Sequence, residues 1–114
     1  MPTLILRTNR VVSPEQRPAL LEAASRTVAE MLGKPERYVM VTLEDALSMV
    51  FAGSDEPAAY LELKSIGLPE KHTKDYSAHL CELLEDKLEI PRERVYIEFT
   101  DAPRHMFGWN GGTF

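Results

Sequence analysis

The sequence predicts an α/β (α+β) fold in which a β-α-β unit occurs twice, and three observations support this prediction. Apolar residues recur with the period of a strand, then a helix, then a strand, and this order appears twice along the chain. The stretches "GKPERYVMVTLED" and "EIPRERVYIEFTD" share an outline, so that Pro35, Val39 and Asp45 each match a residue of the same type 56 positions later. With 114 residues, the chain can bury one core.

The first half of the chain is predicted to form a strand, a helix and a second strand. "TLILRTN" predicts the first strand, and Ser13 followed by Pro14 is typical of a helix N-cap and first helical position. Pro18 conflicts with this start, because a proline beyond the first turn removes a helical hydrogen bond. Gly33 and Pro35 end the helix, and "YVMVTL" follows as a strand rich in branched residues. The apolar stripe of the helix consists of Leu21, Ala24, Val28, Met31 and Leu32.

The second half repeats this order. "AAYLELK" alternates as a half-buried strand does, with Leu61 and Leu63 on one face, and "SIGLPE" predicts a turn. A second helical stripe follows, and "RVYIEFT" alternates as the last strand. The helical stripe consists of Tyr76, Leu80, Leu83, Leu84 and Leu88. One face of the last strand carries Val95, Ile97 and Phe99, and the other carries Tyr96, Glu98 and Thr100.

The connections determine how the strands can pair. A crossover helix makes the strands that flank it parallel, so we expect a four-stranded mixed sheet with two helices on one face. The two units would form a single domain over residues 1–114, as pseudo-repeats at about 2–45 and 58–101. The opposite face of the sheet needs a cover, and in a chain this small another copy of the chain is the simplest one.

Composition and charge exclude several classes of function. The formal net charge is -5 and the basic residues are scattered, so we expect neither a nucleic acid nor a membrane as partner. No segment is apolar over the roughly 18 residues that a membrane span needs, and the first residues lack the apolar core of a signal peptide, so we expect a cytoplasmic protein. Cys81 is the only cysteine, which rules out an internal disulfide. Because His72, His79 and His105 fall on different predicted elements, we expect no metal site.

The proline at position 2 has two interpretations. Initiator methionine is generally removed before a small residue, and Pro2 would then carry a secondary α-amino group. Such a group titrates near roughly 7.7 to 8.0, and an apolar site lowers its pKa by disfavouring the cation, which suits a general base. Alternatively, the proline simply begins an edge strand, where its missing N–H costs little. From position alone, the second interpretation is the more common one.

Five stretches, taken together, favour the first interpretation. "MPTLILRTN", "GKPERYVMV", "SIG", "RVYIEFTD" and "GWNGGTF" occur in order from residue 2 to the C-terminus, and the ending is a rare one. In these stretches the chain resembles the macrophage migration inhibitory factor family of the tautomerase superfamily. The resemblance implies a homotrimer of duplicated β-α-β units in which Pro2 is the catalytic amine. It also implies that no cofactor is required.

The resemblance implies roles for further residues, and each has a simpler alternative. Lys34 resembles the lysine that binds the substrate carboxylate and steadies the enolate, although lysines at helix C-termini commonly just interact with the helix dipole. Ser65 and Ile66 resemble the turn whose backbone N–H contacts the substrate, and without the family they indicate only a turn closed by Gly67. Tyr96 resembles a tyrosine that a neighbouring subunit contributes, but a lone strand tyrosine is more often a packing residue.

Four more side chains are assigned to the mouth and wall of the pocket by this resemblance. Tyr38 is similar to an aromatic residue at the pocket mouth. Met106, Phe107 and Trp109 lie in the stretch that walls the pocket, and the alternative for these three is packing between subunits.

Two residue patterns depart from the family. Glu98 stands where vertebrate members usually have asparagine, on the same strand face as Tyr96. A carboxylate near Pro2 would raise the pKa of its amine and oppose the effect of burial, or it would favour a substrate with a cationic or hydroxyl group. Ala58 and Leu61 stand where some members have a Cys-x-x-Cys pair, so a thiol oxidoreductase activity has no chemical basis in this chain.

These residues lead to one main function and two alternatives. The main prediction is keto-enol tautomerisation of phenylpyruvate-like 2-oxo acids, in which neutral Pro2 moves the proton while Lys34 and the Ile66 amide hold the oxygens. The first alternative is a cytokine-like binding protein with a weak or vestigial site, which acts on a receptor protein if it is exported without a signal peptide. The second is a hydratase-like or decarboxylase-like enzyme in which Glu98 activates water, but the paired arginines that such enzymes use cannot be placed in one pocket.

Overall fold

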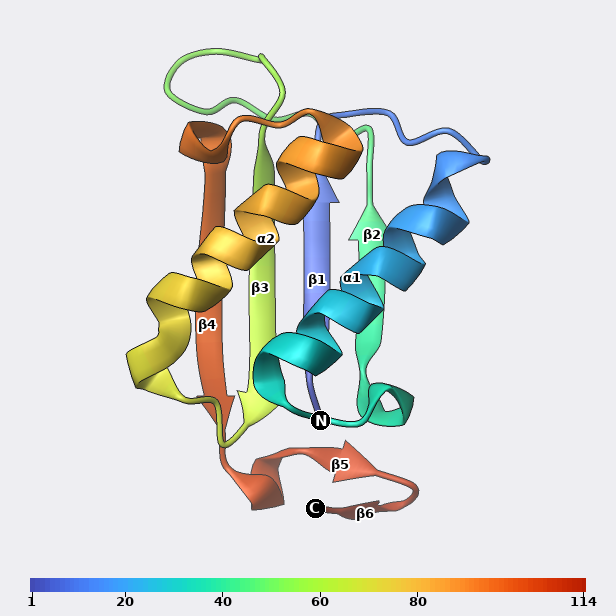
Figure 1. The fold of residues 1–114 in the computed structure, drawn as a ribbon, viewed down its shortest axis with the longest axis vertical. Coiled ribbons are helices and arrows are strands. Elements are labelled where there is room, and N and C mark those ends of the chain that lie inside the picture. Colours follow the sequence, from blue (N-terminus) through green and yellow to red (C-terminus); the bar gives the residue numbers. More distant parts are fainter.

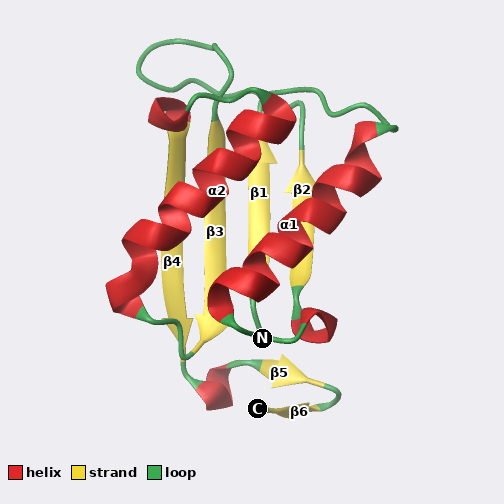
Figure 2. Cartoon of the chain, viewed as in Figure 1, coloured by secondary structure: helices red, strands yellow, loops and turns green.

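The four long strands form one sheet, and both long helices lie on one face of it (Figure 1, Figure 2). This architecture comes from a computed structural model that describes residues 1–114. Its elements are β1 (Thr3–Thr8), α1 (Gln16–Leu32), β2 (Met40–Glu44), β3 (Ala59–Ile66), α2 (Thr73–Leu88), β4 (Val95–Ala102), β5 (Gly108–Trp109) and β6 (Gly112–Thr113). The strand order is β2-β1-β3-β4; β1–β2 and β3–β4 are parallel, and the central β1–β3 pair is antiparallel. The predicted mixed sheet built from a duplicated β-α-β unit is confirmed.

The duplication is visible in the hydrogen bonds that close each unit. The Asp45 carboxylate accepts a hydrogen bond of 2.8 Å from the Val12 N–H, and the Asp101 carboxylate accepts one of 3.1 Å from the Leu68 N–H. Each aspartate thus holds the segment that follows the first strand of its unit. The hydrogen bond from Val12, together with an ion pair of 2.9 Å from Arg17, lowers the pKa of the Asp45 carboxyl.

The first helix begins later than the sequence predicts. Pro14 lies in a preceding turn, and helical structure starts at Gln16. Ser13 still acts as a cap, because the Gln16 N–H donates to Ser13 Oγ at 3.2 Å and the Ser13 N–H donates to Gln16 Oε1 at 3.2 Å. With this later start, Pro18 falls in the first helical turn, where N–H groups have no partner within the helix. The proline therefore removes no helical hydrogen bond, and the conflict in the sequence disappears.

The hydrophobic core lies between the sheet and the two helices. Alternate residues of β1 and β3 are buried, as the alternating pattern predicts, and so are the predicted residues of the α2 stripe. In α1 the buried face differs by one position, because Leu20 is buried with Ala24 and Val28 whereas Leu21 is only half-buried. The spacing of four residues keeps the three buried side chains on one helix face, and Leu21 lies beside it. Neither helix is long and apolar enough to cross a membrane.

Two segments near the predicted site have a different local structure from the expected one. Tyr38 lies in a short 3-10 turn that precedes β2 rather than in the strand itself. Ser65 and Ile66 complete β3, because β4 extends far enough to pair with both of them. The turn comes one residue later, at Gly67, whose φ of 66° is readily adopted by glycine.

A short C-terminal hairpin, formed by β5 and β6, is an addition to the predicted fold. Asn110 and Gly111 connect the two strands with φ values of 51° and 78°. Positive φ at both positions is what a two-residue type I′ turn requires, and Asn-Gly is the strongest short sequence signal for such a turn. The hairpin could therefore have been predicted from the sequence.

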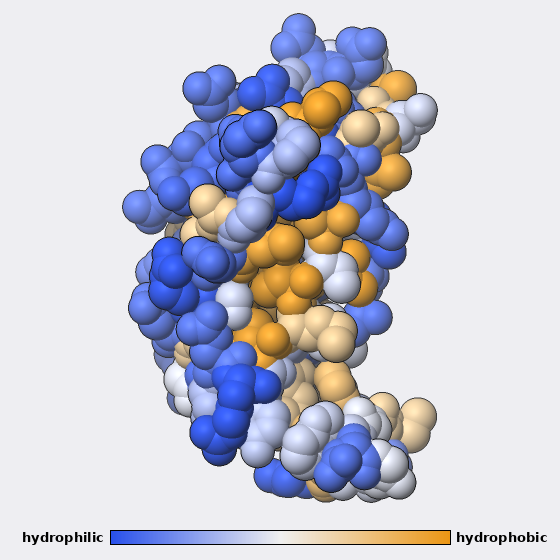
Figure 3. Space-filling model, turned by 90° about the vertical axis from the view of Figure 1, so that its right-hand side faces the viewer, coloured by the Kyte–Doolittle hydropathy of each residue, from blue (hydrophilic) through white to orange (hydrophobic).

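The second face of the sheet is not covered by any element of the chain (Figure 1). β2 and β4 are the two edges of the sheet, and Val41 and Leu43 of β2 are only half-buried against the core. Figure 3 views the molecule from the side of β2 and shows apolar side chains gathered in a stripe beside the polar helix surface. An edge strand with unpaired backbone groups and apolar neighbours is suited to pairing with another chain.

Candidate active site

Pro2 lies immediately before β1, at the end of the sheet where the chain begins (Figure 1). Its side chain is fully buried, and its carbonyl accepts a hydrogen bond of 3.0 Å from the Met40 N–H. β1 is an interior strand between β2 and β3, so the alternative that this proline begins an edge strand is wrong. A proline nitrogen has no N–H to donate to a neighbouring strand, so its position in an interior strand leaves no buried backbone donor unpaired.

Lys34 brings a positive charge to the same end of the sheet. It follows Gly33, which ends α1 with a φ of 62°, and the Lys34 N–H donates to the Ala29 carbonyl at 3.0 Å. The terminal amine, which in this chain belongs to Met1, has a pKa below its ordinary value, because burial and then the Lys34 charge both disfavour the cation. Lys34 is therefore close enough to act electrostatically on an amine at the start of β1.

The end of β3 lies beside the start of the chain. The antiparallel register pairs Thr3 with Lys64, so the next two residues of β3 run alongside Pro2. Of these, Ser65 is fully buried and its hydroxyl donates to the Ile66 carbonyl at 3.3 Å, while Ile66 is half-buried. The structure thus brings the predicted proline, lysine and serine-isoleucine segment to one end of the sheet.

An aromatic cluster belongs to the same end of the molecule. Tyr38 meets Trp109 edge-to-face with ring centroids 5.7 Å apart, and Phe114 stacks on Trp109 at 5.5 Å. Phe107 lies against Phe114 at 6.0 Å, whereas Met106 is 72% exposed. Phe114 is an additional member of this cluster, to which the resemblance assigned no role. The Asn-Gly turn is the signal that could have found it, because this turn folds the chain back until the Phe114 N–H donates to the Phe107 carbonyl at 3.2 Å.

Tyr96 and Glu98 do not join this group within one chain. β4 runs parallel to β3 (Figure 1). The register pairs Tyr96 with Tyr60, and Tyr60 with Arg7, which places Tyr96 near the end of the sheet opposite Pro2. Five residues along β1 and two strands across give a separation of about 20 Å, at about 3.3 Å per residue and 4.8 Å per strand. Tyr96 is 65% exposed and packs edge-to-face on Phe51 at 4.8 Å, and Glu98 accepts a hydrogen bond from the Tyr60 hydroxyl. A site that contains both Pro2 and Tyr96 needs a second copy of the chain.

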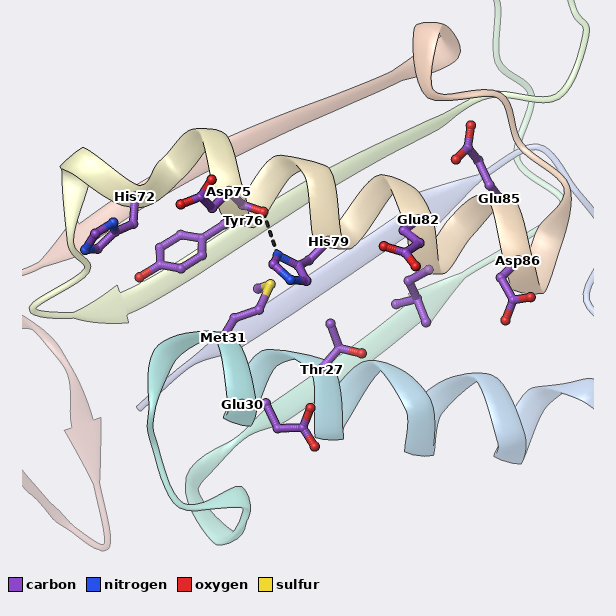
Figure 4. Close-up of a pocket in the computed structure, with 11 residues that line it drawn as sticks. Thr27, Glu30, Met31, His72, Asp75, Tyr76, His79, Glu82, Glu85 and Asp86 are labelled. Atoms are coloured by element: carbon purple, nitrogen blue, oxygen red, sulfur yellow. Dashed lines mark hydrogen bonds between the residues drawn. The ribbon is translucent and has the colours of Figure 1, made fainter.

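The main groove on the surface of the single chain lies elsewhere, between α1 and α2 (Figure 4). Its volume is about 910 Å³, and none of the predicted site residues lines it. A pocket that two chains share would not form a cavity in one chain alone. A site at Pro2 is therefore compatible with a groove that lies elsewhere on the single chain. Nowhere in the chain does a group of three or more His, Cys, Asp or Glu side chains come together to hold a metal ion. The acidic residues of the groove are Glu30, Asp75, Glu82, Glu85 and Asp86.

The thiol chemistry considered for this chain is also constrained by the structure. Cys81 is buried in α2, and burial raises the pKa of its thiol, which disfavours the reactive thiolate. Ala58 and Leu61, at the positions of the missing cysteine pair, are both buried. Cys81 is therefore not a candidate nucleophile.

Fold and site together define a class of protein: a duplicated β-α-β domain whose interior strand begins at a buried proline, next to a lysine charge and an aromatic cluster. Comparisons with known proteins identify this class. Residues 1–114 match the family model described as macrophage migration inhibitory factor (MIF). The chain therefore belongs to the macrophage migration inhibitory factor family, which is known for tautomerase and cytokine roles.

Individual relatives agree with this assignment. The macrophage migration inhibitory factor homolog of Brugia malayi is 44% identical over 97 residues, which cover 84% of each chain. Macrophage migration inhibitory factor of Mus musculus is 38% identical over 117 residues, covering 100% of this chain and 99% of the mouse protein. The crystal structure of the homologue from Prochlorococcus marinus is 40% identical and matches with a TM-score of 0.92 over 98% of both chains.

Proposed function

We propose that this protein is a keto-enol tautomerase that acts on phenylpyruvate-like 2-oxo acids, with the amine of Pro2 as the catalytic base. The observation that carries the proposal is the burial of Pro2 at the start of an interior strand, where the Lys34 charge acts on the terminal amine. Removal of Met1 would turn the Pro2 nitrogen from an amide into a secondary amine.

The surroundings of Pro2 favour the neutral amine that a general base needs. An α-amino group in water titrates near roughly 7.7 to 8.0. Burial and the Lys34 charge both lower the pKa of the terminal amine of the chain, and without Met1 they would act on Pro2 directly. A large fraction of this amine would then be free base at neutral pH, where general base catalysis is most effective.

The proposed reaction moves one proton and needs no cofactor. The Pro2 amine takes the proton from the carbon beside the carbonyl, the C–H electron pair becomes the carbon–carbon double bond, and the charge moves to the carbonyl oxygen. The Pro2 cation then returns the proton to that oxygen, which gives the enol. Lys34 and the Ile66 N–H would hold the carboxylate and enolate oxygens, and the aromatic cluster of Tyr38, Phe107 and Trp109 would contact the substrate ring.

A homotrimer with its sites at the subunit interfaces is part of this proposal. The two edges of the sheet, β2 and β4, differ in sequence, so pairing one edge with the other in a second copy is a head-to-tail contact. Such contacts form a ring when the rotation between copies closes, and the proposed trimer is a ring of this kind. In such a ring Tyr96 and Glu98 of one subunit would reach the Pro2 site of the next, and the uncovered face of the sheet would be enclosed.

The proposal is tested with the native N-terminus. The protein is expressed, removal of Met1 is verified by mass, and phenylpyruvate tautomerisation is followed across pH. The controls are Pro2→Gly, which replaces the ring amine, and a chain that retains Met1, in which the Pro2 nitrogen is an amide. We expect turnover that the chain retaining Met1 loses and that Pro2→Gly, which keeps only a primary α-amine, carries out much more slowly. Undiminished turnover in either control would overturn the role of Pro2.

A second candidate is a cytokine-like binding protein in which the tautomerase site is weak. Glu98 favours this candidate, because a carboxylate brought near Pro2 would keep the amine protonated at neutral pH. The family name of the relatives adds support, since it describes an effect on macrophages. Binding to a receptor protein by Pro2→Gly as strong as that of the native chain would separate this function from catalysis.

A further inference from the structure

Glu98 is held on the uncovered face of the sheet by one neighbour. The Tyr60 hydroxyl of β3 donates to a Glu98 carboxylate oxygen of β4 at 2.5 Å. The two residues are not direct cross-strand partners, because the register pairs Tyr60 with Tyr96 and Glu62 with Glu98. The hydrogen bond is therefore diagonal, and it draws the Glu98 carboxylate along the strand toward Tyr60.

No positive charge competes with Tyr60 for this carboxylate. Glu62, the direct partner of Glu98, carries the same charge. Arg7 is occupied, since it pairs with Glu44 at 2.6 Å and with Glu62 at 3.5 Å. Lys64 lies one row further along β3, and no ion pair joins it to Glu98. The hydroxyl of Tyr60 is thus the one group that holds the Glu98 side chain in place.

The hydroxyl also keeps its proton under ordinary conditions. The hydrogen bond to Glu98, with a smaller effect from burial, raises the pKa of Tyr60 to about 12. Tyr60 therefore remains a donor over the whole range in which an amine near Pro2 would titrate.

We propose that Tyr60 is a positioning residue that holds the Glu98 carboxylate against its own sheet and so limits its attraction for the Pro2 cation of the adjoining site. This inference rests on the proposed function, because it assigns Pro2 the role of base and Glu98 a place in the site. Without the hydroxyl, the Glu98 side chain would rotate freely and approach the cation. A closer carboxylate stabilises the cation, and the amine then loses its proton only at a higher pH. The Lys34 charge acts on the amine in the opposite direction and is the same in every variant.

The experiment compares four chains: the native protein, Tyr60→Phe, Glu98→Gln and the double variant. The pH midpoint of the Pro2 amine is measured in each by NMR titration of protein labelled with ¹⁵N-proline and, in parallel, from the acid limb of kcat/KM for phenylpyruvate. We expect Tyr60→Phe to raise the midpoint by about half a pH unit and Glu98→Gln to lower it. The double variant should titrate like Glu98→Gln, because Tyr60 acts only through that carboxylate.

A matched control removes a hydroxyl elsewhere. Tyr76 lies in α2, on the other face of the sheet, so Tyr76→Phe should leave the midpoint unchanged. The inference is overturned if Tyr60→Phe leaves the Pro2 midpoint unchanged, or if it shifts the midpoint equally with and without Glu98. The NMR titration needs no turnover. If no chain turns over substrate but the shift appears only when Glu98 is present, the proposed function fails while the coupling of Tyr60 to the amine holds.

Discussion

Lys34 would have two electrostatic effects in the proposed site, one on the substrate and one on the base. Its charge would attract the carboxylate and the developing enolate of the substrate. The same charge lowers the pKa of the amine at the start of β1, together with burial. Both effects would promote catalysis at neutral pH. Substitution of Lys34 separates them, because only the effect on the base appears as a shift of the pH profile.

We predict that Lys34→Ala lowers kcat/KM for phenylpyruvate by about 100-fold, as is typical when one donor to a developing oxyanion is removed. It should also move the acid limb of the pH profile to higher pH, because the protonated amine no longer faces a like charge. Lys34→Arg keeps the charge and should leave the acid limb in place. An acid limb that does not move in Lys34→Ala would mean that the lysine acts on the substrate alone.

At the scale of elements, one aspartate in each β-α-β unit holds the segment that follows the first strand, by accepting a hydrogen bond from its backbone. Asp45 combines the hydrogen bond from Val12 with the ion pair from Arg17, whereas Asp101 has the equivalent hydrogen bond and no ion pair. The folded protein therefore favours the charged form of Asp45 more strongly than the unfolded chain does, and the pKa of this carboxyl lies below its ordinary value.

We predict that Asp45→Asn lowers the Tm at pH 7 and that the deficit narrows as the pH falls. A carboxyl with a depressed pKa contributes stability above the pKa of the unfolded chain, and it loses this contribution as the pH falls through the folded value. The matched variant Asp101→Asn should lower the Tm by less, because Asp101 makes no ion pair. Thermal melts from pH 7 to pH 3 provide the measurement. A deficit of constant size over this range would contradict the role of the charge.

The C-terminal hairpin supports the aromatic cluster, and its turn depends on one glycine. Gly111 has a φ of 78° with open space around it, so an added Cβ would meet no atom but would be strained by the backbone conformation. We predict that Gly111→Ala destabilises the hairpin by about 1 kcal/mol and raises the KM for phenylpyruvate more than it lowers kcat. Gly112→Ala is the control, since its φ is not positive and its Cβ would only touch the Trp109 carbonyl. Equal kinetics for the two variants would separate the hairpin from the site.

Periodicity predicted the order of the elements and most of the core, because an element with one buried face has apolar residues at the period of a helix or a strand. It did not predict where α1 begins, since Ser13 caps through a side-chain pair one turn before the helix. It also could not place Ser65 in β3, because the length of that strand depends on its pairing with β4. The grouping of Lys34 with Pro2 follows from the resemblance and agrees with the fold. The distance from Pro2 to Tyr96 follows from the strand register, which no local pattern contains.

At the scale of the whole molecule, the two ends of the sheet have different chemistry. One end carries Pro2, the Lys34 charge and the aromatic cluster, and the start of β4 at the other end presents the exposed Tyr96. Each end of such a subunit would contribute part of a site, and a neighbouring subunit would supply the rest. Assembly would then be a condition for catalysis and not only for stability.

We predict that the protein sediments as a trimer of 12.9 kDa chains and that two defective chains can restore one another. Pro2→Gly and Tyr96→Ala should each have low activity alone. When the two are unfolded, mixed and refolded together, some interfaces should combine an intact Pro2 from one chain with an intact Tyr96 from the next, and the activity should rise above the sum of the separate samples. A mixture no more active than its parts, or a monomeric protein with full activity, would contradict a shared site.

The duplicated unit limits how many reactive centres one polypeptide can have. The residue that matches Pro2 in the second unit is Ala58, which is equally buried. Its nitrogen is an amide whose N–H donates to Asn9 Oδ1 at 2.9 Å, and the chain continues on both sides of it. A free α-amine exists only at the N-terminus of a chain, so a second copy of the unit within the same chain cannot carry one. Under the proposed mechanism, duplication enlarged the scaffold without adding a second base, so the stoichiometry of titratable Pro2 amines to polypeptide is one to one.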